Sequence, residues 1–571
     1  MKAYGIDLGT TYSCIAKADA QGNVEVIKNI EGKNITPSVV QFISQTEVVV
    51  GETAKGEAIL DPDNVAQYIK RFMGKQEDTF EYHGKVYTPE QISAFILKKL
   101  VEDADAATGE KIKDVVITVP AYFGFDERHA TENAGKIAGL NVLSIVNEPT
   151  AAAIAYGNNK TKEDKVVLVY DLGGGTFDVT VAEIVGDKVT VICTEGNHTL
   201  GGKDWDAELI SYFVAQFCEK TGVEEDEIYE DSEVRNELAL KAEEAKKNLT
   251  SKPSASFSLS LGRGKRAKLE VTREKFDEIT RHHLLSTIEL TKTVIKQAAT
   301  KTSSKGKTCD NFDEIIFVGG STRMRQVEEV VKKEFGVEPR IFDPDEAIAR
   351  GAALLAQELK TEQKALGALG TKSVKGGLGQ ARLGEVTSKS YGARAIVNGE
   401  SKLYNFILKN EPIPTTKTDT LGTLVRNQPT MEVAIFESNL MEEVVELSFG
   451  NPLWERHPNS SLKDDPNIPY LELPPGLPEG APVEITFSLD LNGLLEITAI
   501  EKKSGRKCNF AIKTKGLSNE DVVELRKQTS AVKVTDAEDS VAPSNSSPMT
   551  DQATPPANDM PADSGDDPWD L

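Results

Sequence analysis

Two stretches of the chain, about 160 residues apart, share one pattern of apolar and polar positions. Apolar runs occupy residues 4–7, 13–17 and 24–28 in the first stretch, and residues 166–171, 177–184 and 188–194 in the second. In each stretch the last two runs are joined by turn-forming residues, DAQGN in the first and VGD in the second. Short apolar runs bounded by such turns are typical of β-hairpins. Each stretch is therefore predicted to form a three-stranded meander.

Each meander is followed, further along the chain, by a strand–helix–strand–helix pattern. Residues 114–157 and residues 313–357 each contain an apolar strand, a short turn, an amphipathic helix, a second strand and an alanine-rich helix. The repeated order predicts a duplicated α/β fold over residues 1–360, with a central sheet in each half. Two such halves would leave a cleft between them, and the first turns of the two meanders would face each other across it.

The pattern changes after the second alanine-rich helix. Residues 361–387 are rich in glycine and in small or charged side chains, which predicts a linker. Alternating segments with the hairpin turns DLNG and KSG predict a small all-β sandwich over residues 388–515. Ser518, followed by acidic residues, predicts a short helix within residues 516–530. Residues 531–571 are mostly Asp, Ser, Pro and Ala, and are predicted to be a disordered acidic tail.

Composition narrows the class of protein. A chain of 571 residues is expected to form two or three domains. Its formal net charge of −24 leaves no basic excess to pair with nucleic-acid phosphates. The five cysteines are scattered and form no CxxC pair, which disfavours a disulfide framework or a zinc site. No apolar run approaches the roughly 18 residues of a membrane span and no signal peptide is evident, so a cytoplasmic protein without nucleic-acid or membrane partners is expected.

The first turn of each meander carries an acidic residue followed by glycine. One turn reads DLGTTY from Asp7, and the other reads DLGGGT from Asp171. Backbone N–H groups in such turns bind anions, and the hydroxyl side chains add donors. Two of these loops on opposite sides of a cleft would clamp a polyphosphate. The two aspartates repel phosphate directly, so they would act through a hydrated Mg²⁺. Either motif alone is more often an ordinary turn, but both in matching positions favour the polyphosphate site.

A third glycine-bearing motif, FVGGST at residues 317–322, lies between a predicted strand and a predicted helix. Such a turn permits close backbone approach to the α-phosphate or ribose of a nucleotide. A tight strand–helix turn without a ligand explains the motif equally well. The sequence contains neither a Walker A motif nor GxGxxG, so P-loop and Rossmann folds are not supported.

Six stretches resemble the signature sequences of the DnaK-type, seventy-kilodalton heat-shock chaperones, which belong to the actin-like ATPase superfamily. They are GIDLGTTYS, VPAYF, NEPTAAAIAYG, DLGGGTFDV, LGGKDWD and VGGSTR. Residues 411–420 and 483–505 resemble, less specifically, the family's β-sandwich substrate-binding domain. The resemblance extends to about residue 527. It implies an ATPase domain followed by a peptide-binding domain, with ATP or ADP, Mg²⁺ and K⁺ as cofactors.

The resemblance also implies roles for individual residues. Lys70 matches the lysine that contacts the γ-phosphate and positions the attacking water, and Glu148 would help to order the water and the metal. Without the resemblance, Lys70 would be interpreted as a surface-helix lysine and Glu148 as a helix N-terminal carboxylate. Asp171 and Thr176 complete the implied catalytic set, and Asp7 and Asp171 are the implied metal residues. The implied reaction is in-line attack of water on the γ-phosphate, which depends mainly on positioning and charge neutralisation.

The other implied nucleotide contacts lie in both loops and around the adenosine. They are Asp7, Gly9, Thr10, Thr11, Tyr12, Gly173, Gly174, Gly175, Gly202, Glu243, Lys246, Lys247, Thr250, Gly319, Gly320, Ser321, Arg323 and Asp345. Lys247 stands where some members have an arginine that stacks on adenine, and a lysine cannot stack in that way. Pro120 and Arg128 match the residues that relay the nucleotide state to the other domain. Read alone, they would be a turn proline and a solvated arginine.

Three features depart from the family pattern. The predicted linker keeps only Leu378, Leu383 and Val386 where the family has an acidic, leucine-rich run, which weakens the expectation of interdomain coupling and of stimulation by J-domain partners. The chain has no room for the usual helical lid, so bound peptide is expected to leave quickly. Residues 448–476 are longer and richer in proline than the family's corresponding segment, which is interpreted as a partner-binding loop or as a tolerated insertion.

The leading hypothesis is an ATP-dependent chaperone that binds extended apolar segments of unfolded polypeptides, with a J-domain co-chaperone and a nucleotide exchange factor as possible partners. Leu403, Leu424 and Met431 align loosely with the family's peptide groove, although sandwich-core positions explain them as well. An alternative is an ATP-gated adaptor that holds one dedicated partner. A sugar kinase or a filament-forming protein on the same ATPase fold is a third, and the C-terminal β domain argues against it.

Overall fold

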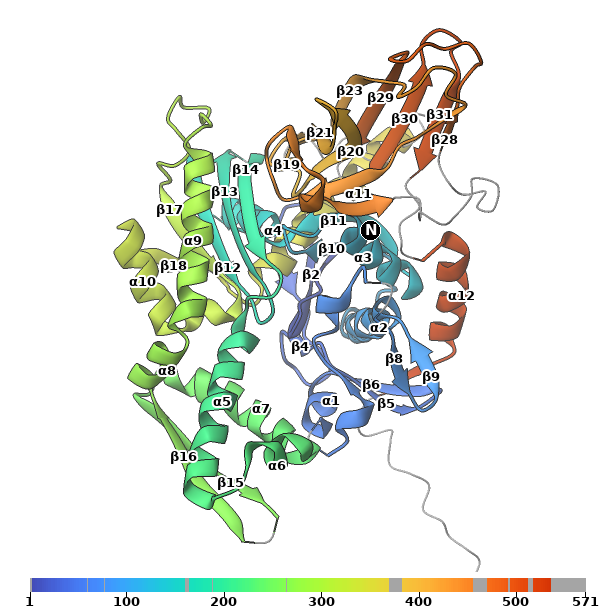
Figure 1. Cartoon of the computed structure of the whole chain (residues 1–571). Helices are drawn as coiled ribbons and strands as arrows, with labels where there is room; N and C mark the ends of the chain where they lie inside the picture. Colours follow the sequence, from blue (N-terminus) through green and yellow to red (C-terminus); the bar gives the residue numbers. More distant parts are fainter. Residues whose placement is uncertain are drawn as a thin grey trace, which may run out of the picture.

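The computed structural model describes residues 3–535, apart from residues 59, 76–77, 160–163, 187, 263, 369–382, 455–469, 491–492 and 512–516. Two α/β lobes face each other, and a β-rich region is seated against them at the top of the view (Figure 1). None of the helices in the described part combines the length and the apolar character that a membrane crossing requires.

The central sheet of lobe I has the strand order β11-β10-β1-β2-β3, with β4 beside β2. Strand β1 pairs antiparallel with β2 and parallel with β10. The predicted meander and the two strands that follow it therefore lie in one sheet. The strands are β1 (Ala3–Asp7), β2 (Tyr12–Ala18), β3 (Val24–Val26), β4 (Thr36–Pro37), β10 (Asp114–Val119) and β11 (Asn141–Asn147).

The central sheet of lobe II repeats this arrangement in the order β18-β17-β12-β13-β14. Strand β12 pairs antiparallel with β13 and parallel with β17, as β1 does with β2 and β10. The repeated order matches the predicted duplication of the α/β pattern. The strands are β12 (Lys165–Leu172), β13 (Phe177–Val185), β14 (Lys188–Asn197), β17 (Glu314–Val318) and β18 (Pro339–Ile341).

The two alanine-rich helices lie between the central sheets. Alanines of α4 (Glu148–Asn159) and α11 (Ala347–Ala368) share one buried cluster with Val116 of lobe I and Val167 of lobe II. The small side chains let each helix approach both sheets closely, which joins the lobes at the base of the cleft. The other helices of the lobes outside their insertions are α2 (Pro89–Thr108) and α3 (Phe125–Ile137) in lobe I, and α9 (Arg281–Ala298) and α10 (Arg325–Phe335) in lobe II.

Each lobe also carries an insertion, placed toward the lower end of the cleft in Figure 1. In lobe I the insertion consists of β5 (Val40–Ser44), β6 (Glu47–Val50), α1 (Glu52–Glu57), η1 (Pro62–Asn64), β7 (Val65–Ala66), η2 (Ile69–Phe72), β8 (Phe80–Tyr82) and β9 (Lys85–Tyr87). In lobe II it consists of α5 (Gly202–Thr221), α6 (Glu225–Glu230), α7 (Ser232–Leu249), β15 (Ser254–Leu261), β16 (Lys265–Thr272) and α8 (Arg273–Ile279). The short helix η3 (Gly320–Arg323) lies after β17.

The β-rich region is a sandwich of two antiparallel sheets, ordered β26-β21-β20-β25-β27 and β23-β29-β30-β31. The sheets share one apolar core, in which the ring of Phe406 stacks on that of Phe487 at 4.4 Å. The first sheet contains β20 (Ser390–Val397), β21 (Glu400–Ile407), β25 (Ile435–Ser438), β26 (Val444–Glu446) and β27 (Asn451–Trp454). The second contains β23 (Thr415–Gly422), β29 (Pro482–Leu489), β30 (Leu495–Glu501) and β31 (Lys507–Ala511). Smaller elements are β24 (Thr430–Glu432), β28 (Tyr470–Glu472) and η5 (Leu447–Phe449).

The prediction that residues 361–387 are a linker throughout is wrong at both ends. Residues 361–368 continue α11, because this segment consists mostly of good helix formers. At the other end, β19 (Leu383–Val386) pairs in parallel with β14 and antiparallel with β22 (Pro412–Ile413). Strand β14 is the outermost strand of the duplicated sheet, so its free edge can accept a further strand. Residues 369–382 lie outside the described residues.

The prediction that the tail is disordered from residue 531 is wrong for its first residues. Strand β32 (Lys533–Thr535) pairs in parallel with β6 of lobe I, and Val532 is buried beside it. Before it, α12 (Asn519–Ser530) begins at the predicted cap, where Ser518 accepts a hydrogen bond from the N–H of Asp521. Val522 of α12 packs against α2 and α3. The C-terminal helix therefore lies on lobe I. Residues 536–571, and residues 455–469 of the proline-rich loop, lie outside the described residues.

Candidate functional site

A cavity of about 520 Å³ lies between the two lobes. Most of the residues expected to contact a nucleotide line it together, although they come from widely separated parts of the chain. These are Asp7, Gly9, Thr10, Thr11, Tyr12, Lys70, Glu148, Asp171, Gly173, Gly174, Thr176, Glu243, Lys246, Lys247, Thr250, Gly319, Gly320, Ser321, Arg323 and Asp345. Gly175 and Gly202 lie directly behind the lining, since their carbonyl oxygens accept hydrogen bonds from Arg71 and Lys246.

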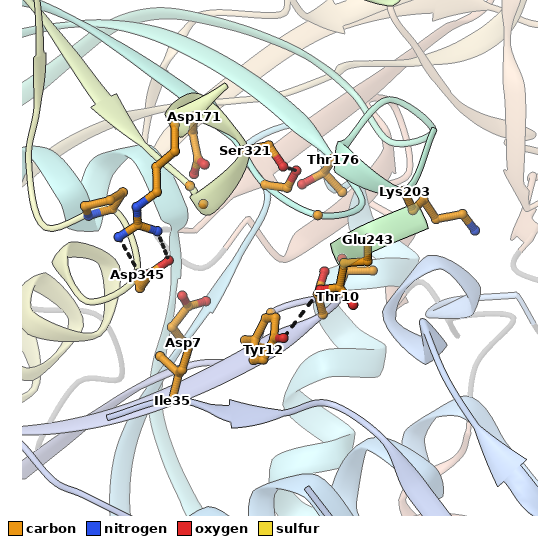
Figure 2. Close-up of a pocket in the computed structure, with 18 of the residues that line it drawn as sticks. Asp7, Thr10, Tyr12, Ile35, Asp171, Thr176, Lys203, Glu243, Ser321 and Asp345 are labelled. Atoms are coloured by element: carbon orange, nitrogen blue, oxygen red, sulfur yellow. Dashed lines mark hydrogen bonds and ion pairs between the residues drawn. The ribbon is translucent and has the colours of Figure 1, made fainter. Parts of the chain in front are cut away.

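The turn between β1 and β2 meets the turn between β12 and β13. A Cβ atom at Gly175 would lie 2.5 Å from Cγ2 of Thr10, and one at Gly174 would overlap the hydroxyl of Thr11. Glycine is required at both positions because the opposite loop occupies the space of any side chain. Figure 2 shows Asp7 and Asp171 on the two sides of the cavity, with Thr10 and Thr176 on the same loops. The two turns therefore face each other across the cleft, as the sequence pattern predicts.

Four carboxylates surround a single lysine beneath these loops. Asp171 and Asp178 lie on β12 and β13, Asp7 ends β1, and Glu148 begins α4; Lys70 lies on η2. Burial, together with the charges of Glu148 and the neighbouring aspartates, raises the pKa of Asp171 well above its usual value. Burial and Glu148 raise the pKa of Asp7 to about 7. One lysine leaves most of this negative charge uncompensated.

The acidic cluster fits a divalent cation. Oδ2 of Asp171 is buried and has no hydrogen-bond partner among the described residues, and Asp7, Glu148 and Asp171 all line the same cavity. Oδ1 of Asp7 accepts only a 3.2 Å bond from Thr118 at its side. An all-carboxylate set facing a roomy cavity suits Mg²⁺, which retains several waters and bridges carboxylates to phosphates. Asp7 and Asp171 are the residues that would hold it.

The side chain of Lys70 is fixed before any ligand binds. Its ammonium group forms an ion pair with Oε1 of Glu148, and both side chains are buried, with Lys70 only 5% exposed. This burial excludes the interpretation of Lys70 as a surface lysine. Arg71 follows it and donates 3.0 and 2.6 Å bonds to the carbonyl of Gly175 and a 2.9 Å bond to Asp204. Lobe I thereby fixes the backbone of the glycine-bearing loop between β12 and β13.

At the opposite end of the cavity, lobes I and II are joined by an ion-pair network. Nζ of Lys55 lies 2.6 Å from Oε2 of Glu243 and donates a 2.9 Å bond to the hydroxyl of Tyr12. Lys247 lies 2.7 Å from the other oxygen of Glu243. Burial would raise the pKa of Glu243, but the two lysines outweigh it and lower the pKa to about 2. The carboxylate is therefore ionised, and its ion pair with Lys55 connects α7 of lobe II to α1 of lobe I. Figure 2 shows Glu243 beside Tyr12.

The remaining wall is built from η3 and from the residues before α11. Ser321 donates a 2.9 Å bond to the carbonyl of Gly173, which ties η3 to the second loop. Arg323 forms a two-point ion pair with Asp345, at 2.9 and 2.7 Å. Nζ of Lys246 donates 2.6 and 2.8 Å bonds to Asp206 and to the carbonyl of Gly202. Ser321, Arg323, Asp345 and Lys246 therefore form a polar edge of the cavity.

Several lining residues were not predicted from the sequence. Lys203 and Tyr68 face the cavity, with the ammonium group 4.8 Å above the phenol ring. Burial and the charge of Arg71 lower the pKa of Lys203. Asp178 belongs to the acidic cluster but does not line the cavity. Tyr68 is close in sequence to Lys70, and Lys203 is close to Gly202. This proximity to predicted site residues is the feature from which they could have been identified in the sequence.

The two predicted relay residues lie between the cavity and the β-rich region. Pro120 is buried between Thr118, which bonds Asp7, and Ala121, whose N–H donates a 3.0 Å bond to Asp178. Arg128 is also buried, which excludes its interpretation as a solvated arginine, and it donates to Asn147. Their relay role stays a prediction.

Asn147 connects Arg128 to the linker strand. Its Nδ2 donates a 2.9 Å bond to Oε2 of Glu385 on β19, and its backbone continues directly into Glu148. Burial raises the pKa of Glu385 to about 7. Gly493 of the β-rich region lies against the side chain of Arg128. One unbroken set of contacts therefore runs from the β-rich region and the linker strand to the acidic cluster.

The three predicted groove residues lie in different environments. Leu403 is fully buried in a small cluster with Ala434, Phe436 and Val445. Met431 packs against the main sandwich core, and Leu424 is 59% exposed. Their role in peptide binding stays a prediction, and they do not share one apolar cluster.

Comparison with known protein families gives one match. A family model described as Hsp70 protein matches residues 3–554, which is nearly the whole chain. The chain therefore belongs to the Hsp70 family, whose members bind ATP or ADP with Mg²⁺, hydrolyse ATP and act as chaperones on unfolded polypeptides.

Proposed function

We propose that this Hsp70-family chain is an ATP-dependent chaperone in which the nucleotide in the interlobe cavity controls the binding of extended apolar polypeptides. The two glycine-bearing loops would hold the phosphates by their N–H groups and by the hydroxyls of Thr10 and Thr176. Glu243 and the polar edge formed by Ser321 and Arg323 would hold the adenosine. The size of the cavity and the polar groups on both of its sides support this placement.

The residues of the acidic cluster would carry out hydrolysis without forming a covalent intermediate. Lys70 lines the cavity beneath the two glycine-bearing loops. There its ammonium group would neutralise charge on the γ-phosphate and hold the attacking water. Glu148 fixes Lys70 and would orient the water. Asp7 and Asp171 would hold Mg²⁺, which supplies charge neutralisation at the transferred phosphoryl group. The family resemblance adds K⁺ as a second ion.

Asn147 contacts both Arg128 and Glu385. This pair of contacts supports the proposal that the nucleotide cavity and the β-rich region are coupled. Asn147 precedes Glu148 in the chain, so a shift of the water-positioning carboxylate displaces the amide that holds the linker strand. The linker strand in turn leads into β20 of the sandwich. This route supports coupling despite the loss of the leucine-rich linker. The same route is compatible with stimulation by a J-domain partner and with the action of a nucleotide exchange factor.

The outer face of the five-stranded sheet is the proposed client surface. It carries the small buried cluster around Leu403 and Phe436, and the exposed side chain of Phe449 lies on η5 beside it. An extended peptide bound there would gain backbone hydrogen bonds and apolar burial. The C-terminal helix packs on lobe I, so it does not cover this surface in the present arrangement. Rapid peptide release is therefore expected.

The proposal is tested by ATP turnover of the full chain, with and without an unfolded apolar peptide. Lys70→Ala should abolish turnover, whereas the matched control Lys75→Ala, at an exposed neighbouring position, should retain it. Peptide-stimulated, Lys70-dependent turnover supports the chaperone. Lys70-dependent turnover that no peptide changes would overturn the coupling and favour an adaptor with one dedicated partner. Turnover that survives Lys70→Ala would overturn the assigned chemistry.

A further inference from the structure

Three potential metal ligands meet on lobe II, outside the cavity. Glu208 lies on α5, and His282 and His283 lie in the first turn of α9. Nε2 of each histidine lies 3.4 Å from the same oxygen of Glu208. The ligand atoms of all three side chains lie within 4.8 Å of one another. None of the three lines the interlobe cavity.

Ordinary hydrogen bonding does not account for this arrangement. Nε2 of His283 is buried and makes no hydrogen bond among the described residues, although an imidazole nitrogen normally has a partner when buried. The two imidazole rings lie 3.9 Å apart, a spacing at which two protonated rings would repel each other. The indole of Trp205 packs 5.1 Å from the ring of His283 and holds it in place. Both nitrogens approach the same oxygen of Glu208, but a separation of 3.4 Å is longer than that of a normal hydrogen bond.

The distances match the edges of a tetrahedral zinc site. Zinc binds histidine nitrogen at about 2.0–2.1 Å and carboxylate oxygen at about 2.0–2.2 Å. In a tetrahedron with bonds of that length, neighbouring ligand atoms are about 3.3–3.5 Å apart. The two separations between a histidine Nε2 and Oε1 of Glu208 are both 3.4 Å, which is the distance expected between neighbouring ligand atoms in such a tetrahedron. A normal charge-assisted hydrogen bond would instead bring the atoms to about 2.7–2.9 Å.

We propose that Glu208, His282 and His283 bind one Zn²⁺ ion, with water as the fourth ligand. Two imidazoles and one carboxylate form a donor set that suits zinc. Mg²⁺ prefers six oxygen ligands and would not compete for the nitrogens. His282 is 61% exposed, so the ion can enter from solvent and an open coordination position faces water. The scattered cysteines disfavoured a zinc site, and this ligand set contains no cysteine.

The position of the site gives the ion a structural role in lobe II. Helix α5 begins at the cavity with Gly202 and leads into the insertion, and the chain returns from the insertion through α8 into α9. The ion would therefore join α5, which leads into the insertion, to α9, which follows it; both helices are labelled in Figure 1. That insertion carries Glu243 and Lys246 of the cavity wall. Zinc would restrain this wall relative to the central sheet.

The experiment is isothermal titration of ZnCl₂ into the untagged, nucleotide-free full chain, in the presence of excess Mg²⁺. The expected result is one Zn²⁺ per chain, bound at micromolar concentration. Glu208→Gln and His283→Gln should each weaken this binding by more than about tenfold. Glu219→Gln, at an exposed position on the same helix, and His198→Ala, at an exposed position elsewhere, should leave it unchanged.

Thermal unfolding with and without zinc provides the second measurement. Zinc should raise the unfolding midpoint of the wild type and of the two control variants, because an ion that binds only the folded chain stabilises it. It should not raise the midpoint of Glu208→Gln, whose own midpoint also shows whether the variant folds. Absence of zinc binding by the wild type would overturn the proposal. Unchanged binding by Glu208→Gln and His283→Gln would also overturn it, since zinc would then lie elsewhere.

Discussion

The two lobes share one strand order, yet each lobe receives a different part of the rest of the chain. The outermost strand of the lobe II sheet, β14, pairs with the linker strand β19, and β22 of the sandwich follows. Within the described part of the chain, the lobe I sheet gains no such strand. Instead, the small insertion sheet of lobe I accepts β32, and α12 packs beside it. The repeated part of the fold forms the cavity, and the added strands distinguish the lobes.

This difference suggests how two lobes with the same strand order transmit the nucleotide state to one part of the chain, the sandwich. Asp7 and Asp171 occupy equivalent turns, so under the proposed function both lobes would contact the nucleotide. Lobe II pairs with the linker strand β19 through the backbone of β14, whereas lobe I reaches β19 through the side chain of Asn147 and also holds α12 and β32. A change in the angle between the lobes would therefore move the linker strand relative to the C-terminal helix. The following predictions test this assignment, from the largest expected effect to the smallest.

Asp7→Asn and Asp171→Asn should both slow ATP turnover, by about 10²–10³-fold. Each change removes one carboxylate that would hold Mg²⁺, and the two turns are structurally equivalent. Steady-state turnover at saturating Mg²⁺ measures the effect, with Asp226→Asn at an exposed position of α6 as the control. A large loss in only one variant would show that the duplicated turns do not share the metal.

Val522→Asp should release the C-terminal segment from lobe I. Val522 is buried against α2 and α3, so a carboxylate there would cost about 2–3 kcal/mol of docking free energy. Hydrogen exchange of the β32 amides measures the loss of protection. Val523→Asp is the matched control, because the adjacent side chain is 55% exposed. Equal exchange in the two variants would contradict the docked arrangement.

Gly384→Val should separate the linker strand from lobe II without damaging the cavity. A Cβ atom at Gly384 would lie 2.9 Å from Cγ2 of Thr190 on β14, so a valine must displace the Thr190 side chain, which weakens the pairing of the two strands. Basal ATP turnover should stay within about twofold of wild type, while stimulation by peptide is lost. Gly56→Val, where open space surrounds the added side chain, is the control. Retained stimulation in Gly384→Val would place the coupling outside β19.

Docking of the linker strand should weaken as the pH rises. Burial raises the pKa of Glu385 to about 7 in the docked strand, above the value of about 4.3 for a solvated glutamate. The docked form therefore binds the proton more tightly, and docking loses free energy between about pH 4 and pH 7. Exchange rates of the β19 amides, corrected for intrinsic exchange, measure this trend from pH 5 to pH 8. Glu385→Gln should remove the trend, and a trend that persists would assign it to another group.

The cavity was largely predictable because its chemistry is local in sequence. Each glycine-bearing turn follows its strand directly, and the repetition of Asp7 and Asp171 in matching contexts indicated two facing loops. The reason for the glycines required the structure, since Gly174 and Gly175 make room for the opposite loop. Tyr68 and Lys203 were missed because they belong to no phosphate-binding motif and reach the cavity only through the folded lobes.

The linker and tail were less predictable because short strands depend on distant partners. Leu383–Val386 and Lys533–Thr535 are only four and three residues long, and each is a strand because a free edge accepts it. Nothing in the neighbouring residues identifies that edge. The length of α11 was also underestimated, because the glycine-rich sequence that follows it suggested an earlier end. The metal ligands on α5 and α9 are separated by more than 70 residues, so only the fold brings them together.

Peptide affinity in ATP and in ADP, compared between wild type and Asn147→Ala, tests the central claim most directly. Asn147 contacts both Arg128 and Glu385, while neither phosphate-binding loop depends on its side chain. We expect the wild type to bind an unfolded apolar peptide more tightly in ADP than in ATP, and we expect this difference to disappear in Asn147→Ala while ATP binding is retained. An affinity that is equal in the two nucleotides for the wild type, or a difference that Asn147→Ala preserves, would contradict the proposed coupling.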